Sequence, residues 1–232
     1  MRIDSHRSLH DLCVSICRVL VGWVLVFANA PASIAGGRDQ IDALLTRYQQ
    51  LGLFNGSALV VDRGQVILKK GYGLANMEWN VPNTPDTKFR LGSITKQFTA
   101  TLVLQLVEQG QIDLSAPVRR YLPEYPSPSG DRVTIHHLLN HTSGIVGYTE
   151  IPSFPATARN SYIPTKFLES FSKLDLLFDP GTKFSYSNSG YFLLGVILER
   201  VTGQPYEKLL RDRIFTPVGM KDSGYDSTQP LL

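Results

Sequence analysis

Residues 89–110 read FRLGSITKQFTATLVLQLVEQG and contain the strongest helical pattern in the chain. Apolar side chains recur three and four residues apart along this stretch, which predicts a helix over residues 93–109. Gly92 comes directly before it. Gly110 is expected to end the helix, because glycine readily adopts the left-handed conformation that closes many helices.

Ser93 and Lys96 lie on one face of this helix, since residues three apart are neighbours there. A serine hydroxyl is a weak nucleophile until a nearby base takes its proton. Lysine can be that base when burial and nearby cations lower its pKa. The simpler interpretation makes Ser93 a helix N-cap. A second Ser-x-x-Lys sequence, at residues 170–173, is predicted to lie on a solvated helix face.

Tyr186 and Asn188 form a second polar pair, just before a helix predicted over residues 189–202. Side chains two residues apart in extended chain point to the same side. A phenol beside a lysine ammonium has a lowered pKa and can move a proton. The asparagine could bind a substrate amide or fix Lys96. The alternative is a pair of turn residues beside a core tyrosine.

Composition and motifs exclude several function classes. The 232 residues have a net charge of +3 without a basic cluster, so no nucleic-acid partner is predicted. Nucleotide-binding glycine motifs and the G-x-S-x-G sequence are absent. His137 and His141 are four residues apart but lack the glutamate and third ligand of a zinc site, so we expect helix-end packing or capping. We predict neither a metal nor a cofactor.

Residues 1–32 have the order of a secretory signal peptide, with arginines, then an apolar run at 19–27, then small residues. The run is shorter than the roughly 20 residues that span a bilayer. We therefore predict secretion or a periplasmic location, with one domain at residues 33–232. The alternative is a membrane anchor at residues 19–28. Both cysteines, Cys13 and Cys17, precede the apolar run, so the rest of the chain has no disulfide.

The remaining patterns predict a mixed chain in which strands come first and helices follow. A helix is expected at residues 38–51 and a hairpin at 57–61 and 65–69. Further helical segments are expected at 118–122, 136–140, 164–174 and 205–213, with loops at 71–88 and 145–162. Only two strands are clear, and two strands make a marginal sheet.

With these motifs in order, the sequence resembles the serine β-lactamase and penicillin-binding protein family, in its class C β-lactamase, esterase and D-peptidase branch. Beside residues 89–100, the likeness includes LLNHTSG at 138–144, FDPGTKFSYSNSGY at 178–191 and IFTPVGM at 214–220. It covers residues 39–226. It implies a β-lactamase/transpeptidase-like α/β fold of α+β character, with an antiparallel sheet flanked by helices and a mainly helical subdomain.

The resemblance also implies a secreted serine hydrolase that forms an acyl-enzyme with an ester, a D-amino-acid peptide or a β-lactam. Ser93 would be the nucleophile, Lys96 would activate it, Tyr186 would relay protons, and Asn188 would orient the substrate and Lys96. The partner would be a small molecule or peptide, a cell-wall peptide included, with no metal or cofactor.

One departure from the family concerns its third motif, Lys- or His-x-Gly on a downstream strand. No such strand is predicted here, since Thr202-Gly203 lies in a connection between helices and residues 221–224 lie in the C-terminal tail. We therefore expect a C-terminally truncated member whose sheet is incomplete. The alternative to an active hydrolase is a catalytically inactive truncated member or a fragment.

Overall fold

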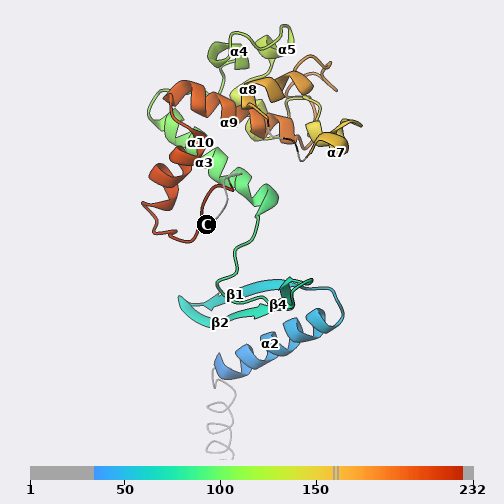
Figure 1. Ribbon diagram of the computed structural model, residues 1–232. Coiled ribbons are helices and arrows are strands. Elements are labelled where there is room, and N and C mark those ends of the chain that lie inside the picture. The colour runs from blue at the N-terminus through green and yellow to red at the C-terminus, as the bar shows by residue number, and fades with distance from the viewer. Residues whose placement is uncertain (1–33, 159, 161, 227–232) are drawn as a thin grey trace, which may run out of the picture. The chain divides into compact units, whose positions relative to one another are not determined.

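The computed structural model describes residues 34–158, 160 and 162–226, coloured along the chain in Figure 1. The chain divides into two compact units between Phe89 and Arg90. The predicted signal peptide at residues 1–32, its alternative as an anchor at 19–28, and both cysteines lie outside the described residues. In the part that is described, no helix is both long enough and apolar enough to cross a bilayer.

The first unit is a helix packed on an antiparallel hairpin (Figure 1), which confirms the predicted helix and strands. Helix α2 (Ile34–Gln50) contacts strand β2 (Gln65–Tyr72), which pairs with β1 (Gly56–Asp62). Arg63 and Gly64 make the turn with φ of 47° and 80°, since paired positive φ values match the twist of a hairpin. Asp42 of α2 accepts hydrogen bonds from Lys70 Nζ at 2.7 Å and Tyr72 OH at 2.8 Å.

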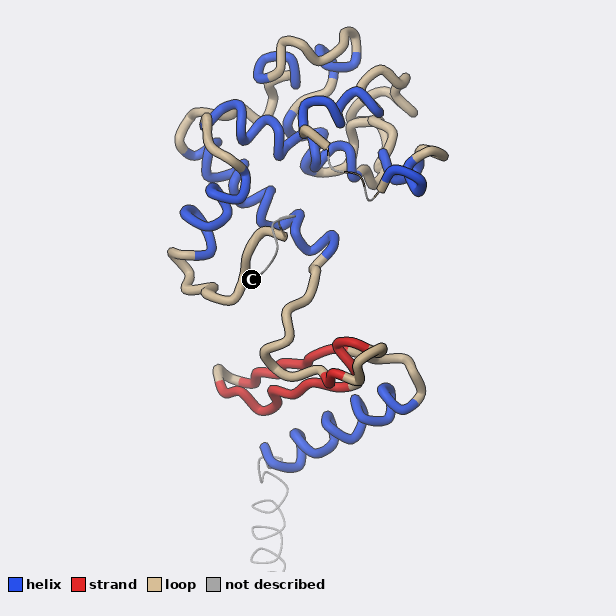
Figure 2. Tube along the Cα trace, in the orientation of Figure 1, coloured by secondary structure: helices blue, strands red, loops and turns tan. Residues whose placement is uncertain are grey.

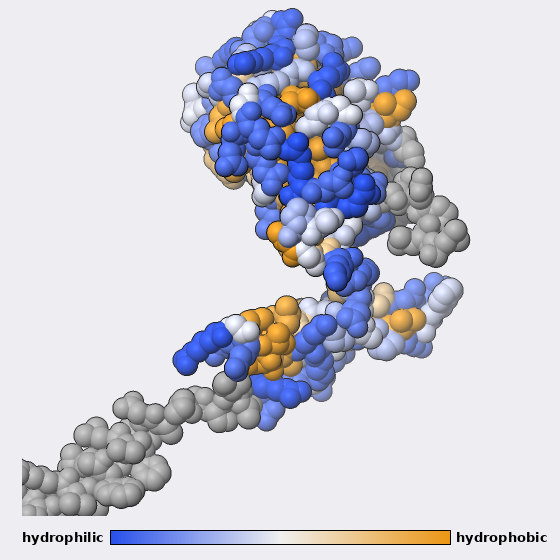
Figure 3. All heavy atoms as spheres, turned by 90° about the vertical axis from the view of Figure 1, so that its left-hand side faces the viewer, coloured by the Kyte–Doolittle hydropathy of each residue, from blue (hydrophilic) through white to orange (hydrophobic). Residues whose placement is uncertain are grey.

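A second, smaller hairpin follows, where the sequence predicts loop. Strands β3 (Leu74–Asn76) and β4 (Val81–Pro82) are too short to carry an alternating pattern. Each sheet of the described residues has two strands. Figure 3 shows hydrophobic side chains on the surface of this unit. The exposed ones include Leu59, Val61 and Val66 of the larger hairpin.

The second unit consists of helices and loops in the described residues (Figure 2). The predicted segment at 164–174 is two short helices, and the segment at 205–213 is an α-helix continued by a π-helical turn. The predicted loop at 145–162 contains two helical turns. The elements are η1 (Gly92–Ile94), α3 (Thr95–Glu108), α4 (Val118–Tyr121), α5 (Ser129–Arg132), α6 (Ile135–Leu139), η2 (Tyr148–Glu150), α7 (Phe154–Thr157), α8 (Pro164–Phe167), η3 (Leu168–Ser170), α9 (Asn188–Thr202), α10 (Tyr206–Leu210) and η4 (Arg211–Phe215).

The core of the second unit forms where α9 packs against α3 and α6. Helices α3 and α6 each bury one apolar face, whereas α9 buries apolar side chains over a wider part of its circumference. The fully buried members include Leu102, Val103, Leu106, Ile135, Leu138, Leu193, Leu194, Ile197 and Leu198. This core holds the start of α3 beside the start of α9, so residues far apart in sequence meet there. Strands in one unit and helices in the other confirm the mixed α/β class.

Gly144, the last residue of the LLNHTSG segment, is a crowded position with a positive φ of 72°. A Cβ atom there would lie 2.5 Å from the carbonyl oxygen of Phe178. The Gly144 carbonyl also accepts the Leu177 N–H at 2.8 Å, so the two chain segments are tied together. The glycine is therefore required both by its backbone angle and by the close approach of a second segment.

We expect Gly144→Ala to lower the free energy of unfolding by about 3 kcal/mol or more, because backbone strain and a steric clash add. Gly110→Ala is the matched control, since Gly110 has a φ of 69° and open space around its Cβ position. It should cost only about 1–2 kcal/mol. Urea unfolding of both variants measures the difference, and equal losses would contradict the steric explanation.

Candidate active site

Ser93 and Lys96 lie at the point where the chain enters the long helix α3. Gly92, with a φ of 54°, turns the chain, and Ser93 is the middle residue of η1. The residues in N-cap position are Leu91 for η1 and Ile94 for α3, and neither makes a side-chain cap. The interpretation of Ser93 as a helix N-cap is therefore wrong. Its hydroxyl is exposed and contacts other side chains instead.

Tyr186 and Asn188 come from a later segment of the same unit, just before and at the start of α9 (Asn188–Thr202). Ser187 is the N-cap of α9, and its hydroxyl accepts the Gly190 N–H at 3.2 Å. Tyr186 precedes the cap in extended chain, and Asn188 is the first residue of the helix. Tyr186 is 42% exposed, so it is not the core tyrosine of the alternative interpretation.

The structure brings all four predicted residues together. The Tyr186 hydroxyl donates to Ser93 Oγ at 2.5 Å, and Lys96 Nζ donates to the same oxygen at 3.3 Å. Lys96 Nζ also donates to Asn188 Oδ1 at 2.7 Å. The serine oxygen thus has two partners with mobile protons, and the ammonium joins the two motifs.

Electrostatics in the cluster favour a charged phenol. Lys96 Nζ lies 4.7 Å from the centre of the Tyr186 ring and 5.5 Å from that of Tyr191. The Lys96 ammonium, and after it the Ser93 hydroxyl, hold the pKa of Tyr186 below its ordinary value of 10. Among the ion pairs of the described residues, none joins a carboxylate to Lys96. The positive charge therefore remains available to a phenolate or to an anionic transition state.

Two further residues support the cluster and were not predicted as part of it. Thr149 Oγ1 accepts from Asn188 Nδ2 at 3.1 Å, which turns the amide so that its oxygen faces Lys96. His141 packs its ring on that of Tyr186, with 4.5 Å between ring centres. His141 lies in the LLNHTSG segment, which the sequence marks, whereas nothing in the sequence around Thr149 distinguishes it.

A cavity of about 460 Å³ opens beside Ser93, within the size range of ligand pockets. Ser93, Lys96 and Asn188 line it together with aromatic side chains. The aromatic members are Tyr148, Tyr191, Phe192, Tyr206 and Tyr225. A substrate that reaches Ser93 can therefore place a sizeable apolar group in this cavity.

The other motifs lie outside this cluster. Ser170 Oγ, of the second Ser-x-x-Lys sequence, donates to the Phe167 carbonyl at 2.8 Å, and Ser170 is the exposed last residue of η3. His137 forms a capping box with Thr134 at the start of α6, as expected for a capping residue. Among the described residues, no group of three His, Cys, Asp or Glu side chains could hold a metal ion.

Comparison with known proteins agrees with this geometry. The family described as Beta-lactamase matches residues 38–231. Esterase EstB of Burkholderia gladioli is 34% identical over 218 residues, which cover 88% of this chain and 55% of that protein.

Two solved structures are similar as well. The penicillin-binding protein from Bacillus halodurans is 32% identical with a TM-score of 0.72, over 81% of this chain and 57% of that one. The D-amino acid amidase from Ochrobactrum anthropi SV3, complexed with D-phenylalanine, is 31% identical with a TM-score of 0.69, over 83% of this chain and 53% of that one.

The chain spans about half the length of the curated relatives that it matches. The match to the family nevertheless covers most of the chain, from α2 to beyond the last described helix. The solved structures share its β-lactamase/transpeptidase-like fold. This protein belongs to the Beta-lactamase family, whose members among its relatives include esterases and amidases of the serine hydrolase type.

Proposed function

We propose that this protein is a serine hydrolase that forms an acyl-enzyme on Ser93. The observation that carries the proposal is the shared contact of Tyr186 and Lys96 with Ser93 Oγ, at 2.5 and 3.3 Å. A nucleophile, a proton acceptor and a fixed positive charge within hydrogen-bond reach are what acyl transfer requires.

In the first step, the Tyr186 phenolate takes the Ser93 proton while Oγ bonds to the substrate carbonyl carbon. We assign the acceptor role to Tyr186 rather than Lys96, because its oxygen, once deprotonated, is the closer of the two to Ser93 Oγ and its pKa is lowered. Lys96 then stabilises the phenolate, a role different from the activation of Ser93 that the resemblance implies. N–H groups in the first turn of a helix have no acceptor within it, so the Ser93 N–H can stabilise the developing oxyanion.

The same groups serve the remaining steps. The bond between the carbonyl carbon and the leaving group breaks, and the Tyr186 hydroxyl gives its proton to that group. Water then attacks the carbonyl carbon of the acyl-enzyme and gives a proton to Tyr186. The bond from that carbon to Ser93 Oγ breaks, and Tyr186 returns the proton to Oγ. Asn188 keeps Lys96 in place through its Oδ1 and presents its amide to the cavity.

The substrates proposed are carboxylic esters, D-amino-acid amides or peptides, and β-lactams. Similar proteins include an esterase, a D-amino acid amidase and penicillin-binding proteins. The aromatic walls of the cavity favour substrates with an apolar or aromatic group near the scissile carbonyl. A cell-wall peptide that ends in D-amino acids belongs to the same class.

Three chromogenic substrates test the proposal: a short p-nitrophenyl ester, a D-phenylalanine p-nitroanilide and a cephalosporin. We expect at least one to acylate the enzyme faster than the acyl group is hydrolysed, which gives a burst of product equal to the enzyme concentration. Mass spectrometry should then find the acyl group on the peptide that contains Ser93. A cooperatively folded protein that no substrate and no fluorophosphonate acylates would overturn the proposal.

We also propose that the protein is secreted, on the pattern of residues 1–32. Edman sequencing of the protein from culture medium or periplasm tests this. A new N-terminus between residues 31 and 36 is expected. An intact N-terminus in the membrane fraction would favour the anchor instead.

A further inference from the structure

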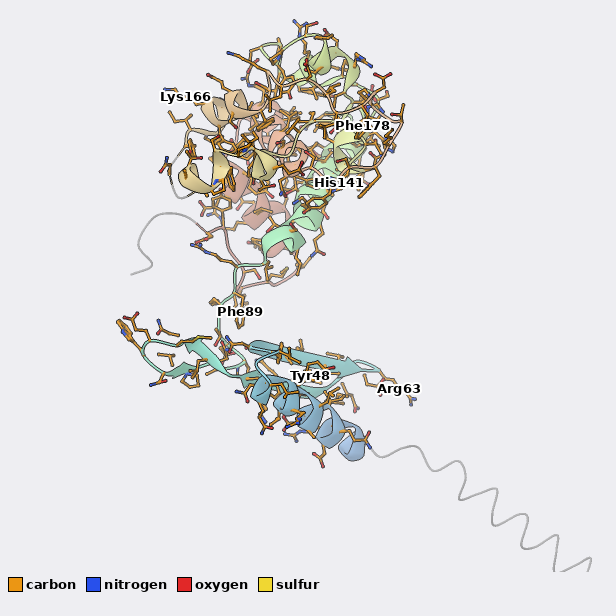
Figure 4. All side chains as sticks on the ribbon, turned by 90° about the vertical axis from the view of Figure 1, so that its right-hand side faces the viewer. Tyr48, Arg63, Phe89, His141, Lys166 and Phe178 are labelled. Atoms are coloured by element: carbon orange, nitrogen blue, oxygen red, sulfur yellow. The ribbon has the colours of Figure 1, made fainter. Side chains whose placement is uncertain are left out.

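His141 occupies a position that suits few residues. It follows α6 with a φ of 60°, in the left-handed region that histidine and asparagine tolerate better than most side chains. Figure 4 labels it in the second unit. This conformation turns the chain so that both the carbonyl and the ring of one residue face the segment that carries Tyr186.

Two hydrogen bonds hold the backbone N–H groups of the residues on either side of Tyr186. The Ser185 N–H donates to the His141 carbonyl at 2.8 Å, and the Ser187 N–H donates to His141 Nδ1 at 3.1 Å. Ser187 is buried, so without the ring nitrogen its N–H would lose its partner away from water. The second bond therefore fixes the backbone at the residue next to the phenol.

The His141 ring also supports the phenol directly. Its centre lies 4.5 Å from that of Tyr186 and 5.1 Å from that of Tyr191, with interplanar angles of 32° and 33°. Tyr191 is in turn anchored by its hydroxyl, which donates to the Leu139 carbonyl at 2.9 Å. The Tyr186 ring thus packs against the His141 ring, which packs in turn against Tyr191 of α9, and Tyr191 is hydrogen-bonded to α6.

We propose that His141 is a positioning residue, which holds Tyr186 against Ser93 and Lys96 through its Nδ1 acceptor and its ring. The inference rests on the function proposed above, in which Tyr186 must lie close to Ser93 and Lys96 to transfer protons. The bond from Ser187 requires a neutral imidazole whose Nδ1 carries no proton. Burial, and then the charge of Lys96, lower the pKa of His141, which favours the neutral imidazole at neutral pH.

Two variants separate the acceptor from the backbone conformation. Asparagine and glycine both tolerate a positive φ. His141→Asn keeps an acceptor oxygen close to the place of Nδ1, whereas His141→Gly removes acceptor and ring together. His136→Leu is the matched control, since His136 is exposed on α6 and, among the described residues, its ring contacts that of His137 and not those of Tyr186 or Tyr191.

The first readout is the ionisation of Tyr186 in the full chain, which needs no substrate. The tyrosinate absorbance of each protein is titrated, and the same titration with Tyr186→Phe added identifies the contribution of this residue among the ten tyrosines. We expect His141→Gly to raise the pKa of Tyr186 toward its ordinary value of 10, because the phenol leaves Lys96. The pKa of Tyr186 in His141→Asn should be closer to the wild-type value, and in His136→Leu it should equal that value.

The second readout is the rate at which a fluorophosphonate labels Ser93. His141→Gly should slow labelling by about 10²-fold, the loss that a misplacement of about 1 Å can cause, and His141→Asn should recover part of it. If His141→Gly leaves the pKa of Tyr186 unchanged, the positioning role is overturned, whatever the labelling rate. If the pKa shifts but the folded wild type is never labelled, His141 still positions Tyr186 and the hydrolase proposal is overturned.

Discussion

Ser93→Ala is expected to abolish covalent labelling by fluorophosphonate or fluorescent penicillin, with turnover reduced by about 10⁴-fold or more. The reason is that the proposed mechanism forms the acyl bond on Oγ, and no other hydroxyl reaches both Tyr186 and Lys96 among the described residues. Labelling is measured by gel fluorescence and intact mass. The side chain is exposed, so the variant should unfold at nearly the same urea concentration as the wild type.

The second Ser-x-x-Lys sequence provides the matched control. Ser170→Ala changes the same residue type in the same four-residue pattern, but its hydroxyl only bonds the Phe167 carbonyl. It should leave labelling and turnover at the wild-type level. Labelling that persists in Ser93→Ala and disappears in Ser170→Ala would show that the nucleophile has been misassigned.

Lys96→Met is expected to slow acylation at neutral pH by about 10²–10⁴-fold, the range of general acid–base effects. The Lys96 ammonium is the largest cause of the lowered Tyr186 pKa, so its removal raises that pKa. A general base acts in its unprotonated form, and the fraction of that form decreases as the pH falls below the pKa of the base. The rising limb of the pH–rate profile should therefore move to higher pH, and part of the lost rate should return in alkaline buffer.

The shape of this pH profile distinguishes two roles of the lysine. If Lys96 itself took the Ser93 proton, Lys96→Met would lose rate at every pH and alkali would not restore it. Lys173→Met, in the second Ser-x-x-Lys sequence, is the control and should leave the profile unchanged, since Lys173 is exposed and lies outside the cavity. A flat, pH-independent loss would contradict the role of Tyr186 as the base.

Local patterns predicted most of the elements that position the site. The long apolar repeat predicted α3, and the alternating runs on either side of Asp62-Arg63-Gly64 predicted the β1–β2 hairpin. Short elements escape such prediction, because β3, β4 and η2 are too brief to show a period. The apolar spacing of residues 164–174 fits one continuous helix, yet α8 ends at Phe167 and η3 at Ser170.

The sequence by itself determined the identity of the four chemical groups and the family to which the chain belongs. Spacing along a helix was enough to pair Ser93 with Lys96, because that pairing is local. Only the tertiary structure decided that Tyr186 lies 2.5 Å from Ser93 Oγ across 93 residues of chain. It alone showed that His141 supports the phenol and that Thr149 turns the amide of Asn188. These contacts depend on how α3, α6 and α9 pack around their shared core, and no local pattern encodes a distance between helices.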